Sequence, residues 1–430
     1  MPQVFQHTLS FSGDPFEVFD TFKDQPHLFF LDSSLKRGQD QFSYIGFAPF
    51  ATVDGGDLSG LRKRFDKYRF VHKGLAFPAG AVGYLGYDGS LFFGFYDTVL
   101  AIDHQKKKLV ISSLSQNRIK DVLVLIRKNI SLSHPHRSSA LKGEGLRKRP
   151  LDFQSNFTKA AYMKAVRQAL EHIRRGDIYQ INLSHQIKVP LPRWRDQASS
   201  AVIYKNLRQC FPSEFGAYFD DGRQVIVSAS PERFVRLQKG VAQVKPMKGT
   251  RPRGNTKAQD KELKDRLLKS PKEIAELLMV TDLERNDLGR VCDYSTVKVK
   301  VMRAIETYAS VFQATSTVEG RLRRDCDSFD LLQAAFPSGS VTGCPKIEAM
   351  KIIKRLERGP RGLYTGALGY MSFSGDMDFN VLIRSMFLRD NQITFHIGGG
   401  IVADSIPLDE WQETLIKAQP MIETLRKTFL

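Results

Sequence analysis

The sequence predicts an α+β fold, with a sheet-rich amino-terminal part followed by mixed helices and strands. Before residue 130, the apolar runs HLFFLDSS and FSYIGFAPFATV are short and are separated by turn residues, which is typical of strands. After residue 155, one segment has the periodicity of a helix and the next has the two-residue periodicity of a strand. The sequence has no repeat of fixed length, which argues against a solenoid or a propeller.

The helical segment comes first. Apolar residues recur there at helical spacing: Tyr162, Val166, Leu170 and Ile173. Gly176 stands where such a helix would stop, so we expect an amphipathic helix of about four turns. From residue 179 to residue 189, apolar and polar residues then alternate, which predicts a half-buried strand. Gln180 and Asn182 would share its polar face.

A polar, basic connection divides the chain. Residues 131–155, SLSHPHRSSALKGEGLRKRPLDFQS, are rich in Ser, Gly and Pro, as is typical of a linker. We therefore expect an amino-terminal segment over residues 1–130, a basic linker over residues 131–155, and the larger domain over residues 156–430.

The composition is that of a globular protein. The chain has 430 residues, 42% of them apolar, and can bury a sizeable core. Its first residues lack the basic start and apolar run of a signal peptide, and no run of about 18 uncharged apolar residues occurs. We expect a soluble, cytoplasmic protein with no membrane contact. The four cysteines are far apart and form no CxxC pair, so we expect separate, reduced thiols.

The net charge of +18 is compatible with nucleic acid, an acidic partner or a small anionic substrate. Much of it lies in three runs, Lys106 to Lys108, Arg137 to Arg149 and Arg321 to Arg324. No run interleaves aromatic residues regularly, as a groove for single-stranded nucleic acid does. We interpret the runs as solvated faces and a linker, and expect no nucleic-acid partner. A basic nucleic-acid-binding module is the alternative, and it predicts binding that weakens log-linearly with salt.

Two segments of helical character each carry two carboxylates three residues apart. These pairs are Glu273 with Glu276 in SPKEIAELLMV, and Glu410 with Glu413 in PLDEWQETLIKA. This spacing places each pair on one helical face. If the two faces meet, the carboxylates could hold a hard cation, and magnesium suits such a set.

Glu273 also has a structural interpretation. Ser270, Pro271 and Glu273 match a capping box, with Ser at the N-cap and Pro in the first turn. Glu276 lies beyond the cap and is the better candidate ligand.

Two glycine-containing stretches could bind an anion. FPSGSVTGCPK, from Phe336 to Lys346, precedes an apolar-periodic helix whose exposed backbone donors would favour an anionic group, although a plain turn and N-cap explains it equally. The stretch is not a P-loop, because no GK followed by Ser or Thr is present. The run from Gly398 to Gly400 lacks the wider GxGxxG pattern and indicates close backbone packing.

Lys248 and Glu232 are candidate reactive groups. Lys248 lies in a turn in QVKPMKGTRPRG. A desolvated lysine among cations can lose its proton and act as a nucleophile or base, whereas a solvated lysine in a basic turn has no such role. Glu232, in VSASPERF, could be a general acid if it is buried, and is an ordinary turn residue otherwise.

In order and context, seven stretches resemble the chorismate-utilising enzyme family: SASPERF, PMKGTRPRG, LLMVTDLERNDLGR, FPSGSVTGCPKIEAMKII, RGLYTGALGY, FNVLIRS and GGGIVADSIPLDEWQETLIKA. The resemblance spans about residues 155 to 425, and LFFLDSS with FSYIGFAPF resembles the amino-terminal segment of the family. It implies a composite layered α/β/β/α sandwich like that of anthranilate synthase component I. Residues 156–430 would be the chorismate-binding catalytic domain.

The family contains anthranilate, aminodeoxychorismate, isochorismate and salicylate synthases, so the reaction depends on particular positions. Lys248 matches a slot that is lysine in aminodeoxychorismate synthases and usually alanine in anthranilate synthases. Gln180 stands where isochorismate and salicylate synthases carry the lysine that activates water. Both residues favour component I of aminodeoxychorismate synthase, which makes 4-amino-4-deoxychorismate from chorismate and ammonia.

The resemblance also implies the mechanism. Magnesium, held by Glu276 and Glu413 with Glu273 and Glu410 close by, would bind the ring carboxylate. Lys248 would add to the ring as the hydroxyl leaves, with Glu232 as the acid, and ammonia would then displace the lysine. Further residues match positions that bind the substrate: Gln180, Thr342, Tyr364, Arg384 and Gly398. The forked guanidinium of Arg384 suits the enolpyruvyl carboxylate.

The resemblance also implies partners. The sequence lacks a GxCxGxQ glutaminase signature, so a separate glutaminase subunit would supply ammonia. A separate aminodeoxychorismate lyase would then release 4-aminobenzoate for folate synthesis.

Two residues depart from the family pattern. Gln313 stands where many relatives carry a histidine, and Gln cannot shuttle a proton at neutral pH. Pro420 falls where the last helix should continue, so that helix should kink or end early.

Two further alternatives stay open. Anthranilate synthase component I would eliminate pyruvate and form an aromatic product, and Lys248 argues against it. The second alternative is a catalytically inactive scaffold for the glutaminase. The intact carboxylates and Lys248 argue against this alternative.

Overall fold

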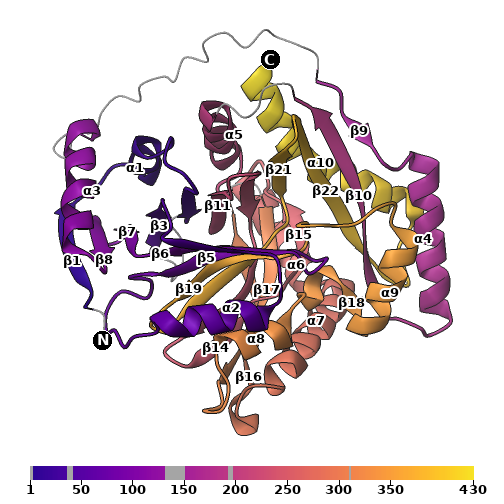
Figure 1. Cartoon of the computed structure of the whole chain (residues 1–430). Coiled ribbons are helices and arrows are strands. Elements are labelled where there is room, and N and C mark those ends of the chain that lie inside the picture. Colours follow the sequence, from indigo (N-terminus) through magenta and orange to yellow (C-terminus); the bar gives the residue numbers. More distant parts are fainter. Residues whose placement is uncertain (1–2, 36–41, 131–150, 192–196, 309–310) are drawn as a thin grey trace.

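The computed structural model describes residues 3–35, 42–130, 151–191, 197–308 and 311–430. Within these ranges, two large antiparallel sheets are covered by helices (Figure 1). An aromatic and aliphatic cluster between the sheets contains residues of both, and other clusters join each sheet to its helices. The α+β fold and the layered α/β/β/α arrangement are therefore confirmed.

The first sheet has 12 strands among the described residues. In spatial order they are β1 (Phe5–Ser10), β8 (Lys108–Ser113), β7 (Thr98–Asp103), β3 (Phe42–Gly46), β2 (Phe29–Asp32), β11 (Phe215–Asp220), β12 (Val225–Ser230), β21 (Ser385–Arg389), β22 (Gln392–Ile401), β10 (Gln180–Pro190) and β18 (Gly343–Cys344), with β9 (Gln154–Ser155) beside β10.

The second sheet has 10 strands in the same described ranges. In spatial order they are β15 (Met247–Pro252), β17 (Val311–Arg321), β14 (Val241–Val244), β13 (Arg233–Gln238), β20 (Met377–Val381), β19 (Ala367–Ser372), β5 (Gly80–Leu85), β6 (Leu91–Tyr96) and β4 (Ala51–Asp54), with β16 (Lys298–Thr307) beside β17.

The helices form the outer layers. Those that cover the first sheet are α1 (Pro15–Thr21), α3 (Gln116–Asn129), α4 (Lys159–Arg174), α5 (Gln197–Cys210), α9 (Lys346–Leu356) and α10 (Pro407–Phe429). Those beside the second sheet are α2 (Leu58–Phe65), α6 (Lys257–Lys269), α7 (Pro271–Gly289) and α8 (Ser328–Ala335). Short 3-10 turns are η1 (Asp66–Tyr68), η2 (Tyr294–Thr296) and η3 (Gly339–Val341).

Alternation along the strands builds these layers. In β2, Phe29 belongs to the cluster between the two sheets, whereas Phe30 belongs to the cluster beneath α1 and α5. Successive side chains of a strand point to opposite faces, so one strand of the first sheet contributes to two layers of core.

The two parts of the chain share both sheets. Strand β2 pairs with β11 through Phe30 and Tyr218, and β5 pairs with β19 through Gly83 and Gly369. Residues 1–130 and 156–430 therefore contribute to one composite core. Of the predicted linker, residues 131–150, including the basic run from Arg137 to Arg149, lie outside the described residues.

The predicted helix is confirmed as α4, which runs for 16 residues and is followed by Gly176 at a φ of 79°. The prediction of a half-buried strand was wrong in one respect. Strand β10 is present, but Gln180 and Asn182 are buried like Ile181, and Tyr179 lies before the strand and is 67% exposed. Over Gln180–His185 the second side of β10 is covered by other elements, which a two-residue period cannot predict. Beyond these residues the predicted alternation holds, with Ile187 and Val189 buried and Lys188 exposed.

Helix α10 continues through Pro420 to Phe429, so it does not end early. A proline removes the hydrogen bond to the carbonyl four residues earlier. That residue is Ile416, which is 73% exposed. A kink at Pro420 stays a prediction.

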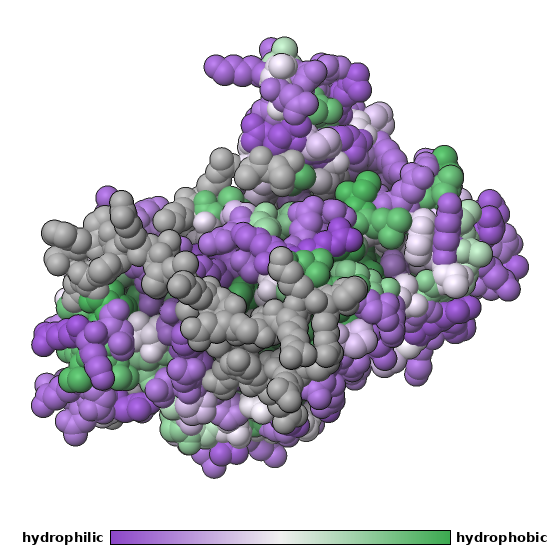
Figure 2. Space-filling view, turned by 90° about the horizontal axis from the view of Figure 1, so that it is seen from above, coloured by the Kyte–Doolittle hydropathy of each residue, from purple (hydrophilic) through white to green (hydrophobic). Residues whose placement is uncertain are grey.

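The molecular surface is largely hydrophilic on the face shown in Figure 2, with hydrophobic residues in small areas. Lys106, Lys107 and Lys108 are exposed at the turn between β7 and β8, and Arg321 and Arg324 are exposed after β17. The helices of the described ranges include none that is long and apolar enough to cross a membrane.

Candidate active site

Lys248 of β15 extends to the first sheet. Its ammonium donates a hydrogen bond to the carbonyl oxygen of Ser340, 3.2 Å away. A Cβ atom at Gly400 of β22 would lie 3.4 Å from Nζ of Lys248 and 3.6 Å from Nε2 of Gln180. The ammonium and the amide therefore share the space over Gly400, which must lack a side chain to leave that space open.

The environment of Lys248 opposes its charge. Burial lowers the pKa of Lys248, while Glu276, Glu232 and Glu413 act to raise it and Lys417 acts to lower it. The net direction is downward, which increases the share of neutral, nucleophilic amine at neutral pH.

Glu232 lies between β12 and β13 and is 3% exposed. Burial raises its pKa to about 7, against a hydrogen bond from Ser340 and the charge of Lys248, which lower it. A carboxyl group with this pKa can hold a proton at neutral pH and release it to a leaving group. The burial that a general acid requires is therefore present.

Several polar atoms of β10 and of Glu232 are buried without a hydrogen-bond partner in the described part of the chain. They are Oε1 and Nε2 of Gln180, Oδ1 of Asn182 and Oε1 of Glu232. A buried polar group without a partner costs about 1–3 kcal/mol. Several unpartnered polar atoms in one site are expected where a polar ligand binds and completes their hydrogen bonds.

The two carboxylate pairs lie on α7 and α10. A Cβ at Gly399 would lie 3.2 Å from Oε2 of Glu410 and 3.6 Å from Oε1 of Glu413. Burial raises the pKa of Glu276. The charges of Lys248 and Lys272 lower this pKa, whereas those of Glu273 and Glu413 raise it further. The charge of Glu413 on α10 thus acts on Glu276 of α7. A magnesium site shared by the two carboxylate pairs stays a prediction.

Basic side chains accompany these carboxylates. Arg251 lies 3.0 Å from Glu273, and Lys417 lies 2.6 Å from Glu413. Across the ranges that the structure describes, no three His, Cys, Asp or Glu side chains form a ready metal-binding group. The oxygen donors suit Mg²⁺ in their chemistry, and a divalent cation would replace the ammonium and guanidinium partners.

Only half of the predicted capping box is present: the side chain of Ser270 accepts a hydrogen bond of 3.4 Å from the backbone N–H of Glu273, whose own carboxylate pairs with Arg251. Pro271 begins α7, as predicted.

Thr342 and Gly398 have mainly backbone roles. The Thr342 hydroxyl donates to the carbonyl of Ser338 at 3.0 Å, which closes the turn η3. Its own carbonyl accepts a hydrogen bond of 2.8 Å from the backbone N–H of Asn182, which aligns this turn with β10. The carbonyl of Gly398 accepts a hydrogen bond of 3.1 Å from Lys417.

Tyr364 is buried and stacks on His396 with ring centroids 4.9 Å apart. Arg384 is half-buried, follows β20 and has a φ of 49°. Burial lowers its pKa, and Tyr308 is the titratable group that acts to raise it. The contacts above bring Lys248 together with Gln180, Glu232 and the carboxylates, whereas Arg384 is placed beside Tyr308.

Sequence reasoning missed Arg361 and Glu357, which form a buried ion pair of 2.7 Å. Arg361 also donates to the carbonyls of Val341 and Asn182, at 2.9 and 2.7 Å. It therefore links η3 to β10 behind Gln180. Local sequence gives no signal for this role, although Lys417 could have been found from its helical i,i+4 spacing to Glu413.

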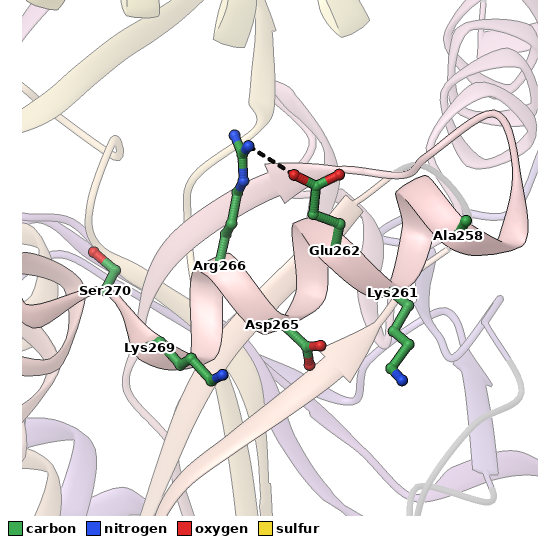
Figure 3. A pocket seen from close by; sticks show the side chains of 7 residues that line it. All are labelled: Ala258, Lys261, Glu262, Asp265, Arg266, Lys269 and Ser270. Atoms are coloured by element: carbon green, nitrogen blue, oxygen red, sulfur yellow. Dashed lines mark ion pairs between the residues drawn. The ribbon is translucent and has the colours of Figure 1, made fainter.

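A depression of about 650 Å³ lies on the outer side of α6. Figure 3 shows its lining between Ala258 and Ser270, with Glu262 and Arg266 paired at 2.7 Å. None of the predicted site residues lines it, so it is separate from the cluster around Lys248.

Comparison with known proteins identifies the family. The sequence pattern of the family described as chorismate binding enzyme matches residues 33–423. The chain belongs to this family. The predicted resemblance is therefore confirmed, and the protein is a chorismate-binding enzyme.

Members of the family differ in the reaction for which they are named. An anthranilate synthase component I-like protein of Synechocystis is 36% identical, over 82% of this chain and 73% of its own. An aminodeoxychorismate synthase of Streptomyces pristinaespiralis is 34% identical, over 94% of this chain and 63% of its own. The structure of anthranilate synthase component I from Streptococcus pneumoniae TIGR4 matches with a TM-score of 0.76 and 31% identity, over 90% of this chain and 93% of its own.

Proposed function

We propose that this protein is component I of an aminodeoxychorismate synthase, which converts chorismate and ammonia to 4-amino-4-deoxychorismate. The observation that carries the proposal is the position of Lys248. Its Nζ lies beside the Gln180 amide over Gly400, and it interacts with Glu232, Glu276 and Glu413.

This position suits a nucleophile. The neutral amine of Lys248 would form a C–N bond to the ring while the ring C–O bond breaks and Glu232 donates its proton, so the hydroxyl leaves as water. Ammonia would then form a C–N bond to the ring and release Lys248 as the neutral amine. The surplus proton of the new ammonium group would return to the Glu232 carboxylate.

Gln180 supports ammonia over water as the second nucleophile. Its neutral amide cannot remove a proton from water, whereas ammonia needs no such activation. Both amide atoms are free to accept from and donate to a substrate within the described structure.

Magnesium would be held by Glu276 and Glu413, with Glu273 and Glu410 nearby. When bound, the ion would supply positive charge for the ring carboxylate of the substrate. Lys417 and Arg251 neutralise part of the acidic cluster themselves, at 2.6 Å from Glu413 and 3.0 Å from Glu273.

The partners follow from the chemistry proposed. A separate glutaminase subunit would supply the ammonia, and a separate lyase would convert the product to 4-aminobenzoate for folate synthesis in the cytoplasm. The sequence contains no GxCxGxQ motif, which is consistent with a separate glutaminase.

Anthranilate synthase component I is the second candidate, because relatives with that name match the chain closely. It would release pyruvate and form anthranilate without a lysine nucleophile. The half-buried Lys248 among carboxylates favours amination without aromatisation.

The test is a covalent adduct. Protein incubated with chorismate and magnesium, without ammonia, should gain the mass of chorismate less one water, with the adduct on Lys248. Lys248→Ala should lose the adduct. Lys245→Ala should keep it, because Lys245 is paired with Glu306 at 2.6 Å. Product formation with no adduct, or an adduct that survives Lys248→Ala, would contradict the proposal.

A further inference from the structure

A second buried carboxyl group lies behind Glu232. Glu284 is on α7, 11 residues after Glu273, and three helical turns place both on one face of the helix. Its side chain is 4% exposed. Nothing in the reaction described above uses this group.

Two serines connect Glu284 to Glu232. The hydroxyl of Ser338 donates to Oε1 of Glu284 at 3.0 Å, and the hydroxyls of Ser338 and Ser340 lie 2.9 Å apart. The Ser340 side chain in turn interacts with the carboxyl group of Glu232 and lowers its pKa. All four side chains are buried, so a chain of polar groups runs from one carboxyl to the other away from water.

The turn that carries the serines is fixed against α7. A Cβ at Gly339 would lie only 2.6 Å from Cδ2 of Leu283, so the backbone of η3 packs directly on the helix. The Ser340 N–H donates to the Ser338 hydroxyl at 3.3 Å, and the Ser340 carbonyl accepts from Lys248. The distances along the path are therefore set by backbone packing.

We propose that Glu232 and Glu284 share a proton through Ser338 and Ser340, and that Glu284 is a positioning residue which restores the proton of Glu232. After Glu232 has protonated the leaving hydroxyl, Glu284 gives its proton to Ser338, Ser338 gives its own to Ser340, and Ser340 gives its own to Glu232. Both serines remain hydroxyls with reversed direction, and Glu284 becomes a carboxylate. The proton released by the new ammonium group enters at Glu232 and passes through Ser340 and Ser338 to the Glu284 carboxylate, which restores the starting state.

The charges around the pair favour a single shared proton. Glu284 faces Glu232, Asp287 and Lys346, while Glu232 also faces Lys248. Burial raises the pKa of Glu284, and the charges of Glu232 and Asp287 raise it further. Lys346 is paired with Asp287 at 2.6 Å. Two carboxyls in a buried site resist double ionisation and titrate as a pair.

The direct test is infrared spectroscopy of the full-length protein across pH, which follows the C=O band of protonated carboxyls. Glu232→Gln assigns the Glu232 component. In Glu284→Gln and in Ser338→Ala, Glu232 should lose its proton about one pH unit lower. The first variant removes the neighbouring carboxylate, and the second removes the hydrogen bond that stabilises its charged form, so Glu284 stays protonated and neutral. Ser338→Thr keeps a hydroxyl and should titrate like wild type.

A matched control is Ser372→Ala, which removes a buried hydroxyl that bonds to Ser374 at 2.7 Å, away from the path. It should leave the Glu232 titration unchanged. If Glu284→Gln does not fold, the titration of Ser338→Ala still tests the shared proton. An unchanged Glu232 titration in the folded variants would overturn the shared proton.

The catalytic role of Glu284 rests on the proposed function and has its own readout. At constant free ammonia, the alkaline limb of kcat/KM for chorismate consumption should move to lower pH in Glu284→Gln and Ser338→Ala, and Ser338→Thr should restore it. If the alkaline limb of kcat/KM stays at the wild-type pH in both variants, Glu284 has no role in the reaction. Wild type that consumes no chorismate would instead contradict the proposed function, while the infrared titration would still decide the shared proton.

Discussion

Lys248 and Glu232 meet at one residue, because the carbonyl of Ser340 accepts a hydrogen bond of 3.2 Å from Lys248 while the Ser340 side chain lowers the pKa of Glu232. The proposed nucleophile and the proposed acid are therefore positioned by the same turn. That turn is held from behind by Arg361, which donates to the Val341 carbonyl at 2.9 Å.

Glu232→Gln should stabilise the protein at alkaline pH. The pKa of Glu232 is raised from 4.5 to about 7 on folding, so the stability it contributes is fully present below pH 4.5 and is lost as pH rises to 7. The loss corresponds to about 3 kcal/mol. The free energy of unfolding in urea of Glu232→Gln, relative to that of wild type, should therefore be about 3 kcal/mol higher at pH 8 than at pH 4.5. An equal difference at both pH values would contradict the raised pKa.

Glu413→Gln should weaken the magnesium dependence. Glu413 lies over Gly399 next to Glu410 and interacts with Glu276. Loss of one carboxylate ligand should raise the magnesium concentration for half-maximal activity at least about tenfold. Glu423→Gln is the control, since Glu423 lies on the same helix and bonds only to Gln419 at 3.0 Å among the described contacts. An unchanged magnesium titration would remove Glu413 from the ligands.

Glu357→Gln should destabilise the fold. It would leave the guanidinium of Arg361, which is 4% exposed, without its 2.7 Å ion partner. Removal of one member of a buried pair costs about 3–5 kcal/mol. Glu348→Gln is the matched control, because the Glu348–Lys351 pair is exposed and should change stability by less than about 1 kcal/mol. Equal denaturation midpoints for the two variants would show that the buried pair is unimportant.

Gly400→Ala should lower activity without unfolding the protein. The added Cβ would contact Nζ of Lys248 at 3.4 Å and Nε2 of Gln180 at 3.6 Å, which is ordinary van der Waals contact that fills the substrate space. Displacement of a reacting group can cost about 100-fold in rate. Gly289→Ala, with no atom within 4 Å of the added Cβ, should leave kcat and KM unchanged. Wild-type kinetics in Gly400→Ala would place the substrate elsewhere.

The sequence predicted those parts of the site that follow from spacing or from motif order. The three-residue spacing predicted that each carboxylate pair shares a helical face, and Glu410 and Glu413 lie together over Gly399. The motifs predicted the family and the layered fold. Neither source predicted that both faces of β10 are buried from Gln180 to His185, because this depends on elements distant in sequence.

The path from Glu232 to Glu284 was also not predictable. Glu284 and Ser338 are 54 residues apart, and each has an ordinary local role in a helix or a turn. Their pairing depends on how η3 packs against α7, which only the tertiary structure provides.

The central claim is the identity of the product, and mass-resolved analysis of a reaction with chorismate, magnesium and ammonium salt tests it most directly. The account predicts 4-amino-4-deoxychorismate, which yields 4-aminobenzoate only when an aminodeoxychorismate lyase is added. Anthranilate formed without the lyase, together with pyruvate, would contradict the account and assign the protein to the anthranilate synthase branch.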